Sequence, residues 1–142
     1  MPYLKVWIHL VFSTKNRFPF LEKGTREKVF QHIKENAKSK DIFIKSINGY
    51  VDHVHVLFSL KPDQSISKVA QLIKGESSFW VNKNNMTKEK FEWQEEYFAV
   101  SVSESAIDNV VSYIENQEAH HSKKTFQEEY LEFVEKFKFQ LS

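Results

Sequence analysis

Two histidines one residue apart suggest metal chemistry more directly than any other pattern in this sequence. His53 and His55 lie in the segment GYVDHVHVLFSL, residues 49–60. Alternate residues of a β-strand share a face, so both imidazoles would point to the same side of a sheet and could bind one cation. An isolated pair of this kind also fits two surface or hydrogen-bonded histidines. Because two ligands make a weak site, a metal centre needs a further ligand from elsewhere in the chain.

The segment DNVVSYIENQEAHH, residues 108–121, offers such a ligand. Residues four apart lie on one face of a helix, which makes Tyr113 and Gln117 neighbours, with His120 near the same face. Gln117 can present an amide oxygen to a cation, and the Tyr113 hydroxyl can lie in a cleft where the helix meets the sheet. The alternative is that Tyr113 packs its ring while Gln117 faces solvent. His120 and His121 could be surface residues or part of a second metal site.

Hydrophobic periodicity predicts the elements that would position these residues. Alternation of apolar and polar residues predicts β-strands, and apolar residues at helical spacing predict helices. The predicted strands cover residues 4–13, 42–50, 51–60 and 97–103. The predicted helices cover 25–39, the segment from Ser65 toward Trp80, the segment around 107–114, and 125–139. The two middle strands form a hairpin, whose turn we place at Asn48-Gly49.

The element order is β-α-β-β-α-β-α-α, and its first six elements match the split βαβ arrangement. We therefore predict an α+β fold of the ferredoxin-like or RRM-like type. It has an antiparallel sheet with helices on one face and an added C-terminal helix that carries Tyr113. Strand parity turns Val54, Val56 and Phe58 toward the helices and leaves the histidines on the opposite face.

Composition limits the class of protein. A chain of 142 residues with 41% hydrophobic residues suits a single domain, residues 1–142. The absence of cysteine excludes a disulfide framework and a thiolate metal site. No apolar stretch approaches the roughly 20 residues of a membrane span, and the N-terminus does not read as a signal peptide, so we expect a cytoplasmic protein. The net charge of +1 does not by itself indicate nucleic-acid binding.

Together these segments resemble the single-tyrosine HUH transposases of bacterial insertion sequences, including the relatives associated with repetitive extragenic palindromes. The family signature is His-hydrophobic-His, which here is His53-Val54-His55, and the tyrosine helix reads YIENQEAHH. The similarity extends in the expected order over HLVFSTKNR (9–17), KGESSFW (74–80), WQEEYFAVSVS (93–103) and YIENQEAHHSKKTFQEEY (113–130).

The resemblance implies an enzyme that cleaves and rejoins single-stranded DNA at hairpin-flanked element ends. It implies Tyr113 as the nucleophile of a 5′-phosphotyrosine intermediate. It implies His53, His55 and Gln117 as the ligands of Mg²⁺ or Mn²⁺. The implied partners are hairpin-containing single-stranded DNA and a second copy of the chain in a homodimer.

The DNA contacts and two alternative functions remain open at this point. Cationic grooves and stacked aromatics bind single strands, and the candidate backbone contacts are Lys15, Asn16, Arg17 and Lys74. One alternative is a non-catalytic nucleic-acid binding module of RRM-like fold, although the segment IHLVF lacks the exposed aromatic pattern of that module. The other is a host-domesticated relative that keeps the same chemistry.

Overall fold

A four-stranded antiparallel sheet organises the computed structural model, which describes residues 3–121 and 125–137. Its spatial strand order is β2-β3-β1-β4, with β1 and β3 in the middle. The strands are β1 (Trp7–Ser13), β2 (Phe43–Tyr50), β3 (His53–Ser59) and β4 (Phe98–Val102). This order and the antiparallel pairing confirm the predicted α+β, split βαβ fold.

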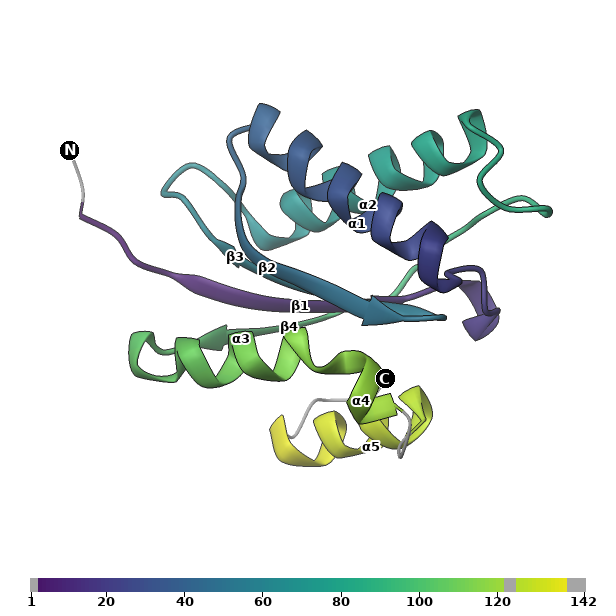
Figure 1. Cartoon of the computed structure of the whole chain (residues 1–142). Coiled ribbons are helices and arrows are strands. Elements are labelled where there is room, and N and C mark those ends of the chain that lie inside the picture. Colours follow the sequence, from purple (N-terminus) through teal and green to yellow (C-terminus); the bar gives the residue numbers. More distant parts are fainter. Residues whose placement is uncertain (1–2, 122–124, 138–142) are drawn as a thin grey trace.

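Helices cover both faces of the sheet (Figure 1). On one face lie α1 (Lys23–Ser39) and α2 (Ile66–Lys83), and on the other lie α3 (Ile107–Glu115), α4 (Gln117–His121) and α5 (Phe126–Phe137). Two short 3-10 helices, η1 (Lys15–Arg17) and η2 (Glu104–Ala106), follow β1 and β4. The final helix was predicted to reach residue 139, and residues 138–139 lie outside the described part of the chain.

The two sheet faces have different compositions because successive strand residues point in opposite directions. The core beneath α1 and α2 contains Ile8, Leu10 and Phe12 of β1 and Val54, Val56 and Phe58 of β3. The opposite face has a smaller apolar cluster of Leu57, Ile107 and Ile114. Strand parity thus leaves the second face to polar side chains, as predicted.

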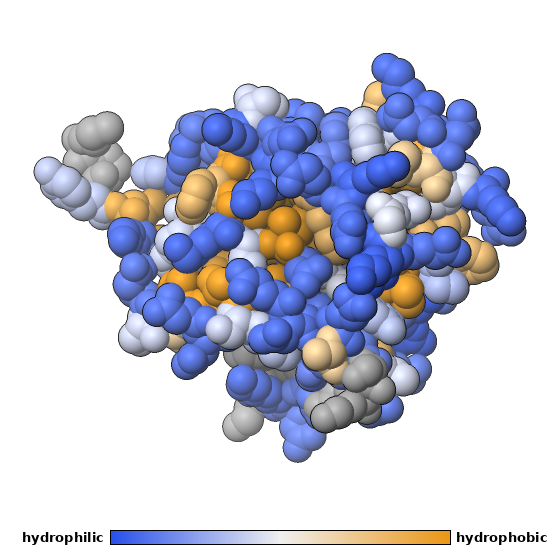
Figure 2. All heavy atoms as spheres, in the orientation of Figure 1, coloured by the Kyte–Doolittle hydropathy of each residue, from blue (hydrophilic) through white to orange (hydrophobic). Residues whose placement is uncertain are grey.

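The surface agrees with a protein that buries its apolar residues. Figure 2 shows a mostly hydrophilic face, with hydrophobic atoms gathered across the middle, at the level of β2. Phe43 on this edge strand is 54% exposed. Among residues 3–121 and 125–137, no helix combines the length and the apolar character that a membrane crossing requires.

The hairpin between β2 and β3 differs from the predicted one. Gly49 lies inside β2, where it pairs with Val54, and the turn falls at residues 51–52. A Cβ atom at position 49 would lie 2.1 Å from the backbone oxygen of His53. Glycine is therefore needed here because the backbone of β3 approaches closely, and the predicted turn at Asn48-Gly49 is wrong.

We predict that Gly49→Ala lowers the free energy of unfolding by about 1–3 kcal/mol, because the added methyl forces β2 away from β3. Urea denaturation measures this change. Gly75→Ala is the matched control, since a Cβ there meets nothing within 4 Å. Alanine favours the interior of a helix over glycine by roughly 0.5–1 kcal/mol, so the control should be slightly stabilised. Equal stabilities for the two variants would contradict the close approach at Gly49.

Candidate functional site

His53 and His55 are fully buried on the sheet face that α3, α4 and α5 cover. Their ring centroids lie 5.1 Å apart. Gln117, at the start of α4, is also fully buried, and its Oε1 lies 3.0 Å from Nε2 of His53. The structure therefore brings together the three side chains that the sequence indicates as metal ligands.

Each histidine of the pair has a partner at its other ring nitrogen. Nδ1 of His53 lies 2.9 Å from Oδ1 of Asp52, which accepts a hydrogen bond from that nitrogen. Nδ1 of His55 lies 2.9 Å from Nε2 of His9, a buried residue of β1. Such partners fix the orientation of an imidazole ring and are typical of metal-ligating histidines. Both Nε2 atoms consequently face the same polar centre beneath the sheet.

A buried carboxylate lies at this centre. Glu129 of α5 is 1% exposed. Its Oε1 lies 2.8 Å from Nε2 of His55 and 3.9 Å from Nε2 of His53. Its Oε2 lies 2.9 Å from Nε2 of His120 and 3.0 Å from Nε2 of His121. Four histidines from β3 and α4 thus surround one acid from α5. Both adjacent histidines of α4, His120 and His121, belong to the site.

The charges in this cluster follow from burial and from the close contacts. Burial alone raises the pKa of Glu129, but hydrogen bonds from His121 and His55 outweigh it, so the pKa falls below its ordinary value and the carboxylate is ionised. Burial lowers the pKa of His55 to about 4 and the pKa of His9 to about 3. Both imidazoles are therefore neutral at physiological pH, and a neutral imidazole has a lone pair for a cation.

Tyr113 lies beside the histidines of its own chain. Its ring centroid is 5.5 Å from that of His55, and its hydroxyl lies near Glu129 and Gln117. Burial and the negative charge of Glu129 raise the pKa of Tyr113 above its ordinary value, so the phenol is protonated. Tyr113 also lines a cavity of about 510 Å³ between β4, α3 and α5. The cavity provides space beside Tyr113 in which a substrate could bind.

The helix that was predicted to carry both Tyr113 and Gln117 is interrupted between them. Asn116 departs from helical geometry, with φ −97° and ψ 22°, so that α3 ends at Glu115 and α4 begins at Gln117. The carbonyl oxygen of Ser112 accepts from the Asn116 side chain at 2.8 Å and from the Asn116 backbone N–H at 3.1 Å. Tyr113 and Gln117 nevertheless stay adjacent, because Nε2 of Gln117 donates to the Tyr113 carbonyl oxygen at 3.2 Å.

Three of the four predicted DNA-contacting residues contact the loop formed by residues 92–95. Lys15, Asn16 and Arg17 form η1, and Lys15 makes an exposed ion pair of 3.4 Å with Glu92 of this loop. The backbone N–H of Asn16 donates to Oε1 of Gln94 at 3.2 Å. Nζ of Lys74 donates to two backbone carbonyl oxygens of the loop at 2.6 and 2.8 Å. Lys74 is therefore engaged in holding the loop.

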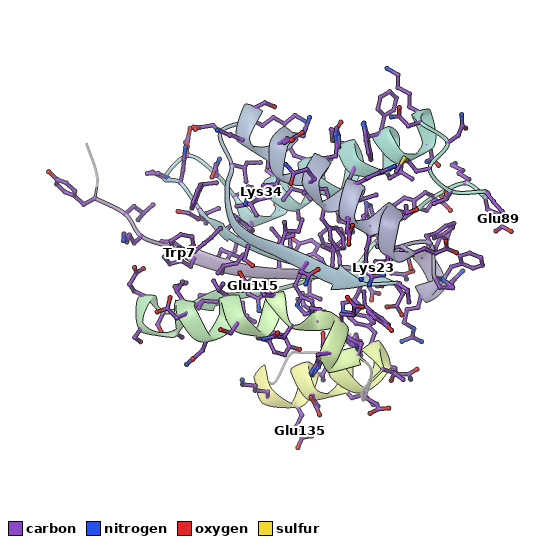
Figure 3. The ribbon with its side chains drawn as sticks, viewed as in Figure 1. Trp7, Lys23, Lys34, Glu89, Glu115 and Glu135 are labelled. Atoms are coloured by element: carbon purple, nitrogen blue, oxygen red, sulfur yellow. The ribbon has the colours of Figure 1, made fainter. Side chains whose placement is uncertain are left out.

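Three residues of the cluster were missed by the sequence reasoning: His9, Asp52 and Glu129. His9 shares the parity of Trp7 and Val11, which places it on the sheet face of the histidine pair. Glu129 follows Phe126 by three residues and therefore lies on the apolar stripe of the final helix. An acid on such a stripe is the signal that could have identified Glu129. Glu135 of the same helix, by contrast, points away from the sheet (Figure 3).

The donor set fits a divalent cation. It consists of two imidazoles with oriented Nε2 atoms, an amide oxygen and a carboxylate. Imidazole and oxygen donors of this kind suit first-row divalent metals and Mg²⁺. His53, His55 and Glu129 each offer one donor atom, and these atoms all lie within 4.8 Å of one another.

Comparisons with known proteins agree with the geometry. The family described as "Transposase IS200 like" matches residues 3–117. A solved structure of a candidate transposase from Deinococcus radiodurans is 23% identical, with a TM-score of 0.67 over 82% of this chain and 93% of that one. A REP-associated tyrosine transposase bound to a REP hairpin is 18% identical, with a TM-score of 0.63 over 85% of this chain and 72% of that one. No curated protein matches the chain significantly.

The lowered histidine pKa values predict a loss of stability in mild acid. Well above pH 6.5, His9 and His55 are unprotonated in both the folded and the unfolded chain. As the pH falls from 6.5 toward 5, both imidazoles become protonated in the unfolded chain but stay neutral in the folded chain. The free energy of unfolding of the metal-free protein should therefore fall by up to about 1.4 kcal/mol per pH unit for each histidine.

Urea denaturation in chelator at several pH values measures this slope. The variant His9→Gln, which cannot titrate but can still donate to His55, should have a shallower slope than the wild type. An unchanged slope would mean that His9 titrates normally in the folded protein.

Proposed function

The chain belongs to the family of IS200-like transposases, and we propose that it is a metal-dependent transposase that cleaves and rejoins single-stranded DNA at hairpin-flanked element ends. The observation that carries the proposal is the position of Tyr113. Its hydroxyl lies in contact with the buried cluster of histidines, Gln117 and Glu129, and it lines the cavity of about 510 Å³.

In this proposal Tyr113 is the nucleophile. Its oxygen attacks the phosphorus of a DNA phosphodiester, the P–O3′ bond breaks, and a new O–P bond forms a 5′-phosphotyrosine. The tyrosine loses its proton and the departing O3′ gains one, which leaves a free 3′-hydroxyl. Because the covalent link keeps the energy of the broken bond, a second 3′-hydroxyl can reverse the step and join the strands without ATP.

His53, His55 and Gln117 are the proposed ligands of Mg²⁺ or Mn²⁺. A cation bound there would polarise the phosphate oxygens and stabilise the charge that develops on them. These three side chains carry no charge of their own when the imidazoles are neutral. Asp52 and His9 keep the two rings in the orientation that directs both Nε2 atoms to the centre.

A second cavity supports a path for the DNA strand toward this centre. It measures about 360 Å³ and lies between η1, β4 and α5. Its lining includes Arg17 together with the aromatic residues Tyr97, Phe98, Phe126 and Tyr130. Stacking on aromatic rings beside a cation is how proteins hold single-stranded nucleic acids. Phe126 also stacks on His53 at 4.4 Å, which joins this cavity to the proposed metal site.

A homodimer remains part of the proposal because the resemblance to the HUH transposases implies one. In the structure of the single chain, Tyr113 is adjacent to the histidines of the same chain. A dimer is thus not needed to bring the nucleophile to the proposed metal ligands. Its role would lie in holding two DNA ends for strand exchange.

We predict that Tyr113→Phe abolishes a covalent protein–DNA adduct. The wild type, incubated with a hairpin-containing single-stranded oligonucleotide and Mn²⁺, should form an adduct that survives denaturing electrophoresis. Phenylalanine preserves the ring but removes the attacking oxygen. The matched control is Tyr50→Phe, since Tyr50 also borders the cluster, with its ring stacked on His121 at 5.5 Å.

The Tyr50→Phe variant should form the adduct at the rate of the wild type. Persistence of the adduct in Tyr113→Phe would exclude Tyr113 as the nucleophile. A wild type that binds the oligonucleotide without forming an adduct would instead favour the non-catalytic binding module.

We predict that Arg17→Ala weakens oligonucleotide binding and reduces the slope of log affinity against log salt concentration by about 0.7, because one phosphate contact is lost. Fluorescence anisotropy at several salt concentrations measures both quantities. Lys28→Ala, on the exposed side of α1, serves as the control and should change neither. Identical salt slopes for wild type and Arg17→Ala would remove Arg17 from the binding path.

A further inference from the structure

We propose that Glu129 is a fourth ligand of the cation site and binds the ion through Oε1, while His120 and His121 hold its Oε2. The inference rests on the proposed function, since it concerns the same metal centre. It adds an acidic ligand from α5 to the set that β3 and α4 provide, and α5 follows the part of the chain that matches the family.

The distances among the donor atoms support this assignment. Oε1 of Glu129 lies 2.8 Å from Nε2 of His55, and Oε1 of Gln117 lies 3.0 Å from Nε2 of His53. Ligands about 2.1 Å from an octahedral ion are separated from their neighbours by roughly 3.0 Å. The observed separations match this spacing, so an ion could bind with small movements of the side chains.

Burial of the carboxylate provides a second argument. An ionised carboxylate that is 1% exposed is costly unless hydrogen bonds and opposite charge compensate for the loss of water. Among the described residues, the ion-pair partners of Glu129 are histidines, and no lysine or arginine lies within ion-pair distance of it. A divalent cation between Glu129 and the histidine pair would supply a permanent positive charge at this position. The neighbouring Glu128 has no such need, since it is exposed.

The outer side of the carboxylate is held in place. Oε2 lies 2.9 Å from Nε2 of His120 and 3.0 Å from Nε2 of His121, both on α4. Both imidazoles therefore lie against Oε2, which leaves Oε1 on the side of the histidine pair of β3. Metal-ligating carboxylates are commonly oriented by polar partners of this kind. This assignment gives His120 and His121 a positioning role.

The assignment has two chemical consequences. With two imidazole nitrogens, an amide oxygen and a carboxylate oxygen, the site favours an ion that accepts both nitrogen and oxygen donors, such as Mn²⁺. Glu129 and Tyr113 also line the same cavity of about 510 Å³, so a cation on Glu129 would place positive charge close to the proposed nucleophile.

Titration of the wild-type protein with Mn²⁺ in a calorimeter tests the proposal. We expect Glu129→Gln to raise the dissociation constant for Mn²⁺ at least about tenfold, because the amide keeps the shape but lacks the charge. The matched control is Glu128→Gln, which changes the adjacent acid on the exposed side of α5 and should leave the affinity unchanged. An equal affinity in wild type and Glu129→Gln would overturn the assignment.

A measurement on unaltered Glu129 covers the case in which the variant does not fold. Coordination shifts the carboxylate stretching bands, so an infrared difference spectrum with and without Mn²⁺ should contain such a shift in the wild type and in Glu128→Gln. Absence of the shift in a protein that binds Mn²⁺ would overturn the assignment of Glu129 and leave the proposed function intact. A wild type that binds no Mn²⁺ would overturn both.

Discussion

Burial of polar side chains on one face of the sheet is the constraint on which the site depends. The central strands β1 and β3 have no solvent-facing side, because α1 and α2 cover one face and α3 to α5 cover the other. Every second residue of β3 must therefore fit a closed environment, and two of these residues are histidines. A buried imidazole is tolerated when it is neutral and hydrogen-bonded. The remainder of the cluster meets this requirement, with Asp52 and His9 at the outer nitrogens and Gln117 and Glu129 at the inner ones.

The polar cluster joins a rigid element to more peripheral ones. His53 and His55 belong to a strand paired on both sides, so their positions follow from the sheet. Tyr113, Gln117 and Glu129 come from three successive helices, of which α3 contacts the sheet through the smaller apolar cluster. Movement of these helices would change the distance between nucleophile and ligands without disturbing the main core. The main hydrophobic core thus lies on the sheet face under α1 and α2, and the candidate site lies on the opposite face under α3 to α5.

Periodicity in the sequence was sufficient to predict the strands, the helices on the core side and the α+β fold, because alternation and helical spacing record which side of each element is buried. It was less successful where a contact between distant segments decides the conformation. Gly49 was predicted to form a turn, whereas the close approach of β3 places it inside a strand. The break at Asn116 could not be predicted either, because the helical pattern of the sequence continues across it.

The sequence by itself determined the pairing of His53 with His55 on one face, the candidate roles of Tyr113 and Gln117, and the resemblance to the single-tyrosine HUH transposases. These features depend on short spacings, which local geometry translates directly into shared faces. Only the tertiary structure brought Glu129 between four histidines, because its position depends on how α5 packs beneath the sheet. The spacing of Glu129 places it on the apolar stripe of its helix, but which side chains it meets, and that both its oxygens are closed off from solvent, are properties of the packed chain.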